Sequence, residues 1–195
     1  AWPVLSGVAE WLTTRVEEIP GGYAIRASMG IAERERPVDN AAFTNMSAVV
    51  VLHETVAAAR RLGPAIDETW REIANRMVVP RRGHCIVSHD GFRIDEEKGA
   101  TPDPLMGLWP VGYPADAAGE QATLDFYLAH AEAYIGSPML SSLYGVWAAR
   151  KGNRRLALKL LEEGYGQFTT GRFLQTLEYR PDKFPEQPQA GLFFA

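Results

Sequence analysis

Apolar residues recur at helical spacing through most of the chain. The spacing predicts a helix over residues 2–15, where Val8 and Leu12 share one apolar face and Pro3 stands in the first turn. Apolar periodicity and flanking Gly, Pro or Asn residues predict further helices over residues 42–62, 67–77, 116–134, 138–151 and 153–163. Because short connections separate several of these helices, we expect them to pair as helical hairpins.

Three stretches lack this periodicity. After the break at Pro20-Gly21-Gly22, the alternation around Tyr23 and Ile25 predicts a short extended segment. Residues 78–112 are too long for a passive connection in a compact domain, so we expect them to line a site or to form a small strand pair. From Gly164 onward the density of Gly, Thr and Pro predicts little regular structure.

These elements predict an all-α fold, in which the 195 residues form one domain, a toroid or solenoid of helical hairpins. No repeat of fixed period is visible, which disfavours a repeat-array scaffold. The chain starts at Ala1-Trp2-Pro3, with neither an initiator Met nor a signal peptide. We therefore expect a truncated domain whose N-terminal part lies outside this sequence.

Composition excludes several classes of function. The net charge is −4 and basic residues do not cluster, which argues against a nucleic-acid partner. No apolar run approaches the roughly 20 residues of a membrane helix, so no membrane span is expected. The single cysteine, Cys85, rules out an internal disulfide but leaves the cellular compartment open. His84 and His89 match no zinc spacing, and we expect neither a metal nor a cofactor.

The densest group of polar side chains lies in residues 28–45, ahead of the predicted helix 42–62. It holds the acids Glu33, Glu35 and Asp39 and the amides Asn40 and Asn45. So many hydrogen-bonding groups suit a sugar. The plainer alternative is that residues 33–36 form a solvated charge run and that Asp39 or Asn40 caps the helix.

Within this segment, Gly30-Ile31-Ala32-Glu33 and the later Asn40-Ala41-Ala42-Phe43-Thr44-Asn45 resemble the signature of glycoside hydrolase family 65. Members usually read Gly-Pro-Asp-Glu-Tyr and, several residues later, Asn-Asn-Ala-Tyr-Thr-Asn. The resemblance implies that Glu33, and not Glu35, is the general acid, and that Asp39, Asn40 and Asn45 contact the sugar. Pro-Asp is replaced by Ile31-Ala32 and the second Asn by Ala41, so contacts of those side chains are absent or supplied elsewhere.

The resemblance continues more loosely through residues 108–114. This run, preceded by Asp103, is similar to a loop in which relatives carry an Asp followed by apolar residues. It makes Asp103 and Trp109 candidate substrate-binding residues. The alternative is a Pro-stiffened surface loop with one aromatic plug.

A second carboxylate decides the mechanism. Residues 171–179 resemble the place where hydrolases of the family carry another Glu, which points to Glu178. An inverting hydrolase needs such a base to deprotonate water, whereas a phosphorylase uses phosphate as the nucleophile. The rival is Glu186, which could equally cap backbone amides in a loop.

Together, the resemblance implies part of an (α/α)6 barrel that hydrolyses a small carbohydrate, an α-glucoside such as kojibiose, with inversion. Two alternatives stay open. One is a phosphorylase of the same family, and the other is a carbohydrate-binding or purely structural helical module whose acids are inert.

Overall fold

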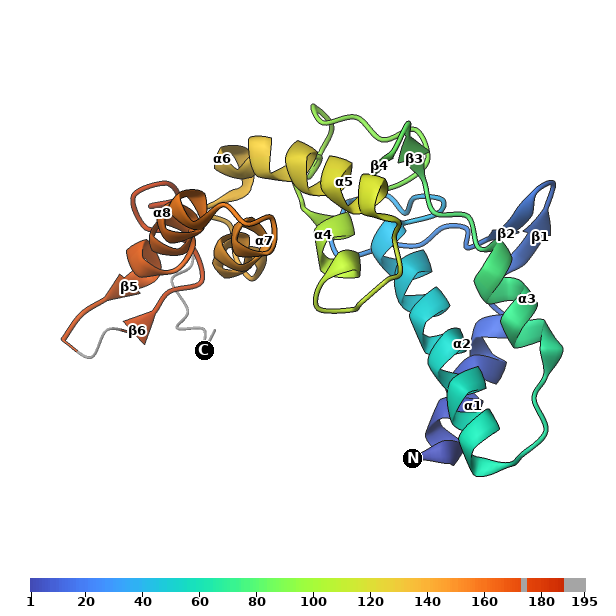
Figure 1. Cartoon of the computed structure of the whole chain (residues 1–195). Helices are drawn as coiled ribbons and strands as arrows, with labels where there is room; N and C mark the ends of the chain where they lie inside the picture. Colours follow the sequence, from blue (N-terminus) through green and yellow to red (C-terminus); the bar gives the residue numbers. More distant parts are fainter. Residues whose placement is uncertain (173–174, 188–195) are drawn as a thin grey trace. The chain divides into compact units, whose positions relative to one another are not determined.

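The computed structural model describes residues 1–172 and 175–187 (Figure 1). The chain divides into two compact units, Ala1–Thr123 and Leu124–Ala195, which are described separately. The described residues are mostly helical, with three short antiparallel strand pairs. The predicted helical class is confirmed as a mostly helical fold, and the short strand pairs depart from a strictly all-α class. The single domain and the barrel stay predictions.

The first unit opens with the predicted N-terminal helix and a tight hairpin. Helix α1 spans Trp2–Thr13, and strands β1 (Glu17–Ile19) and β2 (Gly22–Ala24) pair with Glu18 opposite Tyr23. Gly21, at φ +96°, makes the turn in a conformation that favours glycine. The extended segment expected around Tyr23 is therefore confirmed.

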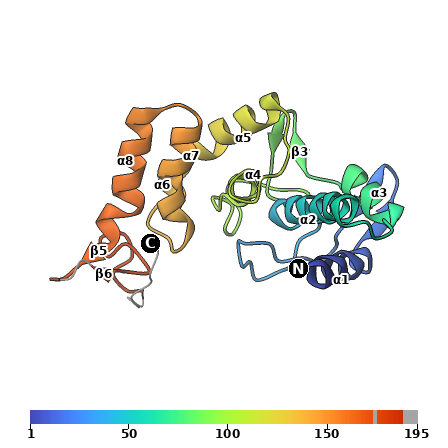
Figure 2. The same cartoon turned by 60° about the horizontal axis from the view of Figure 1, so that its bottom comes forward.

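Helices α2 (Ala42–Leu62) and α3 (Glu68–Arg76) form the predicted hairpin, and both views show them beside α1 (Figures 1 and 2). Gly63 ends α2 in a left-handed conformation at φ +87°. The Asp67 carboxylate caps α3 by accepting from the backbone N–H of Thr69 at 2.9 Å. The core between these helices is apolar and includes Leu52, Trp70 and Ile73.

By length and composition, α2 is also the one helix among the described residues that could cross a membrane. Half of its most apolar window, 50%, is buried inside the protein. Core helices pass the same test, and the packing of α2 against α1 and α3 accounts for its hydropathy.

The long segment after α3 contains the strand pair that was one of its two expected outcomes. Strands β3 (Arg81–Arg82) and β4 (Cys85–Ile86) pair antiparallel. Helix α4 (Asp103–Leu108) was not predicted, because a helix so short shows no periodicity.

The predicted helix 116–134 is two helices, α5 (Ala117–Ala129) and α6 (Ala131–Tyr134), interrupted at His130. The next prediction, 138–151, is the 3-10 helix η1 (Leu140–Leu143) followed by α7 (Tyr144–Arg150).

Helix α8 (Arg154–Gly164) follows as predicted, capped by the side chain of Asn153, and lies beside α7 (Figure 2). An added Cβ on Gly145 would lie 3.0 Å from Leu161 Cβ, so this glycine permits the close helix contact. Helix α8 is followed by η2 (Gly166–Phe168) and by the antiparallel strands β5 (Thr169–Thr170) and β6 (Gln175–Thr176).

Candidate active-site loop

The segment that resembles the family 65 signature is a closed loop before α2. Ser28 and Val38 exchange backbone hydrogen bonds, each 2.8 Å long, and so close the loop at its base. Gly30, at φ +67°, and Glu33, at φ +49°, both adopt left-handed backbone conformations. For a non-glycine residue this conformation is uncommon and costs free energy, and such residues cluster at functional sites.

Glu33 itself presents an available carboxyl group. Its side chain is exposed. Within residues 1–172 and 175–187 it has no hydrogen bond or ion pair, and the carboxyl group can therefore meet a ligand without first breaking an internal contact.

Directly after Glu33, the Arg34 side chain turns inward and is only 5% exposed. Its Nη2 lies 3.5 Å from Glu96 Oε1, and its Nη1 lies 3.7 Å from Asp103 Oδ2. The same Glu96 oxygen is 2.6 Å from His89 Nε2. Asp103 also lies beneath Gly30, where an added Cβ would be 3.8 Å from Oδ2. Asp103 therefore supports the loop on both sides of Glu33.

Burial dominates the chemistry of Asp103. The residue is fully buried, and neither carboxyl oxygen has a hydrogen bond within the described part of the chain. Burial raises the pKa of Asp103 from 3.8 to about 7, although the nearby Arg34 charge opposes the shift. The carboxyl group is thus close to half protonated at neutral pH.

This raised pKa predicts a loss of stability as the pH increases. Between about pH 4 and pH 7 the folded protein keeps the Asp103 proton while the unfolded chain releases it, so the free energy of unfolding falls by about 4 kcal/mol in total. Asp103→Asn removes this titration. In urea denaturation at pH 5 and pH 8, the wild type should lose about 3 kcal/mol more than the variant. Equal losses in both proteins would show that Asp103 does not titrate in this range.

Among the predicted substrate contacts, Asp39 is partly exposed. Its Oδ1 accepts from the backbone N–H of Ala27 at 3.0 Å, and its Oδ2 pairs with Arg26 Nη1 at 3.1 Å. The pKa of Asp39 is lowered, chiefly by the Ala27 hydrogen bond. Asp39 therefore stays ionised and holds the base of the loop.

The two predicted asparagines are buried and bonded to the protein. Asn40 Oδ1 accepts from the backbone N–H of Ile25 and from Asn45 Nδ2, and Asn40 Nδ2 donates to Asp90 Oδ2 at 2.8 Å. Asn45 Nδ2 also donates to the carbonyl of Val78 at 2.7 Å. These side chains join the start of α2 to the residue that follows β2 and to the segments before β3 and after β4.

Trp109 lies in the turn that ends α4 and is half-buried. Sequence reasoning missed Arg34, His89 and Glu96. The available signal was the charge run 33–36, but a charge run by composition alone indicates solvent exposure. Only the fold shows that Arg34 is buried against residues far along the chain.

The two candidate bases belong to the second unit. Glu178 follows β6 and is half-buried, and Glu186 is exposed. The backbone at Glu178 is anchored by its neighbour, because the N–H of Leu177 donates to the carbonyl of Phe168 at 2.8 Å. Phe173 and Leu174, which belong to the motif around Glu178, lie outside the described residues.

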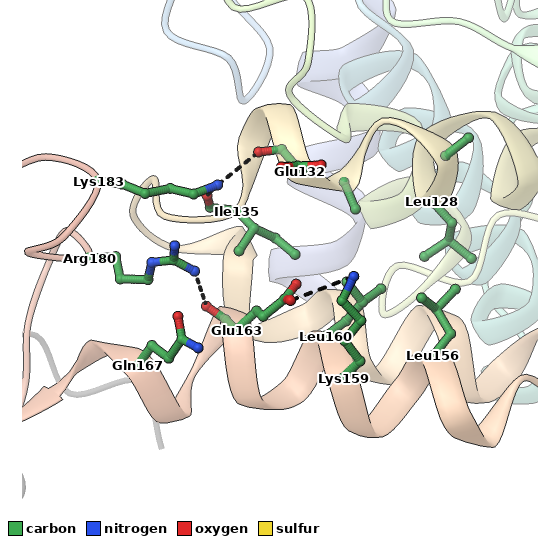
Figure 3. A pocket seen from close by; sticks show the side chains of 12 residues that line it. Leu128, Glu132, Ile135, Leu156, Lys159, Leu160, Glu163, Gln167, Arg180 and Lys183 are labelled. Atoms are coloured by element: carbon green, nitrogen blue, oxygen red, sulfur yellow. Dashed lines mark hydrogen bonds and ion pairs between the residues drawn. The ribbon is translucent and has the colours of Figure 1, made fainter.

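The second unit also contains a cavity of about 400 Å³ between α5, α6 and α8, to which neither Glu178 nor Glu186 contributes (Figure 3). Its floor is apolar and includes Leu128, Ile135 and Leu160. The cationic side chains that line it, Lys159, Arg180 and Lys183, all contact other groups of the protein. Lys183 Nζ donates to the carbonyls of Glu132 and Ile135 at 3.0 and 2.9 Å, and Figure 3 draws the bond to Glu132 as a dashed line.

The other groups with possible chemistry are the single cysteine and the potential metal ligands. Cys85 is half-buried, and burial raises the pKa of its thiol, which disfavours the nucleophilic thiolate. Among the residues that the structure describes, no group of three or more His, Cys, Asp or Glu side chains is arranged to hold a metal ion.

The chain is similar to several curated proteins. Over 130 residues it is 30% identical to protein-glucosylgalactosylhydroxylysine glucosidase of Mus musculus, covering 65% of this chain and 19% of that protein. Over 169 residues it is 25% identical to kojibiose hydrolase of Mucilaginibacter mallensis, covering 84% and 24%. It is 26% identical over 118 residues to a periplasmic acid trehalase of Saccharomyces cerevisiae, covering 59% and 10%.

These relatives are glycoside hydrolases. The similarity supports glycosidase chemistry in general, and it agrees with the expectation raised by the loop around Glu33. The chain spans about a fifth to a quarter of the length of the first relatives it matches, 19% and 24%. No protein-family model matches the chain.

Proposed function

We propose that this chain contributes to an inverting glycoside hydrolase that cleaves an α-glucosidic bond, with Glu33 as general acid. The observation that carries the proposal is the exposed Glu33 carboxyl group, which has no partner among the described residues and stands on a strained loop supported by Arg34 and Asp103. A general acid must reach the glycosidic oxygen in a fixed geometry, and a loop held on both sides of the acid supplies that geometry.

Glu178 is proposed as the general base. In an inverting reaction the base removes a proton from water, and that water attacks the anomeric carbon on the face opposite the departing oxygen. Glu33 donates its proton to that oxygen as the bond to carbon breaks. The half-buried position of Glu178 after β6 supports this role over the exposed Glu186.

The substrate is proposed to be an α-linked glucosyl disaccharide such as kojibiose, or a glucosylated conjugate. The similarity to a kojibiose hydrolase and to a protein-glucosylgalactosylhydroxylysine glucosidase supports this choice. The helical hairpins α2–α3 and α7–α8 are compatible with the (α/α)6 barrel of family 65, to which we propose that the chain belongs.

The expected sugar contacts of Asp39, Asn40, Asn45, Asp103 and Trp109 stay predictions. Burial separates them into two groups. Asn40, Asn45 and Asp103 are 1%, 0% and 0% exposed, which favours an indirect role through the loop. Asp39 and Trp109 are partly exposed and are better placed for direct contact.

The complete natural protein should hydrolyse kojibiose without added phosphate and release the glucosyl unit as β-glucose, together with the reducing-end glucose in the anomeric ratio it had in the disaccharide, so that β-glucose is in excess at first. Proton NMR during the first minutes of turnover distinguishes this anomer from α-glucose, because mutarotation is slower. Turnover that requires phosphate would show a phosphorylase. Binding of the disaccharide with no turnover, with or without phosphate, would show a carbohydrate-binding module.

A further inference from the structure

A cavity of about 290 Å³ in the first unit adjoins the loop that carries Glu33. Residues 34–36 and Val38 line it from this loop, and His89, Glu96 and Glu97 line it from the segment between β4 and α4. Its volume is near the lower end of the roughly 300–1,000 Å³ of small-molecule sites.

Part of the polar lining is fixed by internal contacts. The Glu97 carboxylate accepts from the backbone N–H of Glu35 at 3.3 Å, and Glu96 is held by Arg34 and His89. The side chains of Glu35 and Arg36 are exposed, and neither has a hydrogen bond or an ion pair within the described residues. They supply an acceptor and donors that are available to a ligand.

The mixture of charges restricts which ligand fits. An anion would meet the carboxylates of Glu35, Glu96 and Glu97, and a cation would meet the guanidinium groups of Arg34 and Arg36. A hydroxyl group can donate to a carboxylate and accept from a guanidinium. The lining therefore favours a neutral ligand with neighbouring hydroxyl groups.

The place of the cavity along the chain indicates which part of the substrate it would bind. Arg34 lines the cavity and follows Glu33 directly in the chain, whereas Glu33 itself is not among the lining residues. The acid acts on the oxygen between the glucosyl unit and the leaving group, so one of these two lies beside it. Water must be controlled around the reacting carbon, whereas the departing sugar can lie in an exposed, polar site.

We propose that this cavity is the leaving-group subsite, where Glu35 and Arg36 bind the hydroxyl groups of a neutral sugar. The proposal rests on the hydrolase function proposed above, and it adds two residues that determine which leaving group is accepted. It predicts that Glu35 and Arg36 affect substrates with a sugar leaving group and spare those without one.

The test compares kojibiose with α-glucosyl fluoride, whose leaving group is a single atom, on the complete natural protein. Arg36→Ala and Glu35→Gln should each raise the KM for kojibiose roughly tenfold or more, because each removes a hydrogen bond to a charged group. The KM for α-glucosyl fluoride should change less than about twofold. The matched control is Arg93→Ala, since Arg93 is exposed, pairs with Asp95 and does not line the cavity.

Calorimetric titration with kojibiose distinguishes an error in the subsite proposal from an error in the proposed hydrolase function. An inactive wild type that binds kojibiose, with binding weakened by Arg36→Ala, would refute the hydrolase and support the subsite. If kojibiose binding and KM are the same in the wild type and in both variants, the subsite is wrong. It is also wrong if the variants raise the KM of both substrates equally.

Discussion

Replacing Glu33 with Gln should lower the kcat for kojibiose roughly 10²- to 10⁴-fold, the usual contribution of a positioned general acid. Gln has almost the same shape as Glu but cannot donate an acidic proton to the departing sugar oxygen. The Glu33 side chain is exposed, so the substitution disturbs no internal contact among the described residues. The KM for kojibiose should stay close to that of the wild type, because binding does not need the proton.

A second substrate, α-glucosyl fluoride, provides the internal control through its leaving group. Fluoride departs without being protonated, so Glu33→Gln should retain most of the wild-type turnover of α-glucosyl fluoride. Glu54→Gln, an exposed change on α2, should leave both activities unchanged. Equal losses on the two substrates would mean that the substitution damages the loop, and Glu33 would then not be the acid. The subsite variants differ from Glu33→Gln because they act on the KM.

Local signals in the sequence were sufficient for much of the helical fold. Helix α2 follows the prediction from residue 42 to residue 62, since Gly63 provides a left-handed end. Asp67 similarly marks the start of α3 through its cap. Each of these signals lies within a few residues of the boundary it determines.

Long-range partners explain what the sequence did not reveal. Arg34 belongs to a run of alternating charge that predicts a solvated surface, yet the side chain is buried against Asp103 and Glu96. Asn40 is likewise placed by partners on other segments, Ile25 and Asp90. No local pattern encodes such contacts. The resemblance to a family located the loop, and only the fold shows how it is supported.

Replacing Glu178 with Ala should reduce hydrolysis of kojibiose roughly 10²- to 10⁴-fold, because water is then no longer deprotonated as it attacks. The acid is left in place, so the enzyme can still protonate the departing oxygen. Added azide should restore part of the turnover, since this anion is already a nucleophile and fits the space left by the carboxylate. Its nitrogen bonds to the anomeric carbon as the glycosidic bond breaks, and the product should be β-glucosyl azide.

Glu186→Ala is the matched comparison, because Glu186 is the other candidate carboxylate in the same part of the chain. If Glu178→Ala hydrolyses kojibiose normally while Glu186→Ala is inactive and rescued by azide, the base is Glu186. The anomeric configuration of the azide product tests whether the displacement inverts, which the rate alone does not. Azide that enters where the attacking water stood must give the β anomer from an α-glucoside, whereas α-glucosyl azide would require attack from the leaving-group side and would contradict a single inverting displacement.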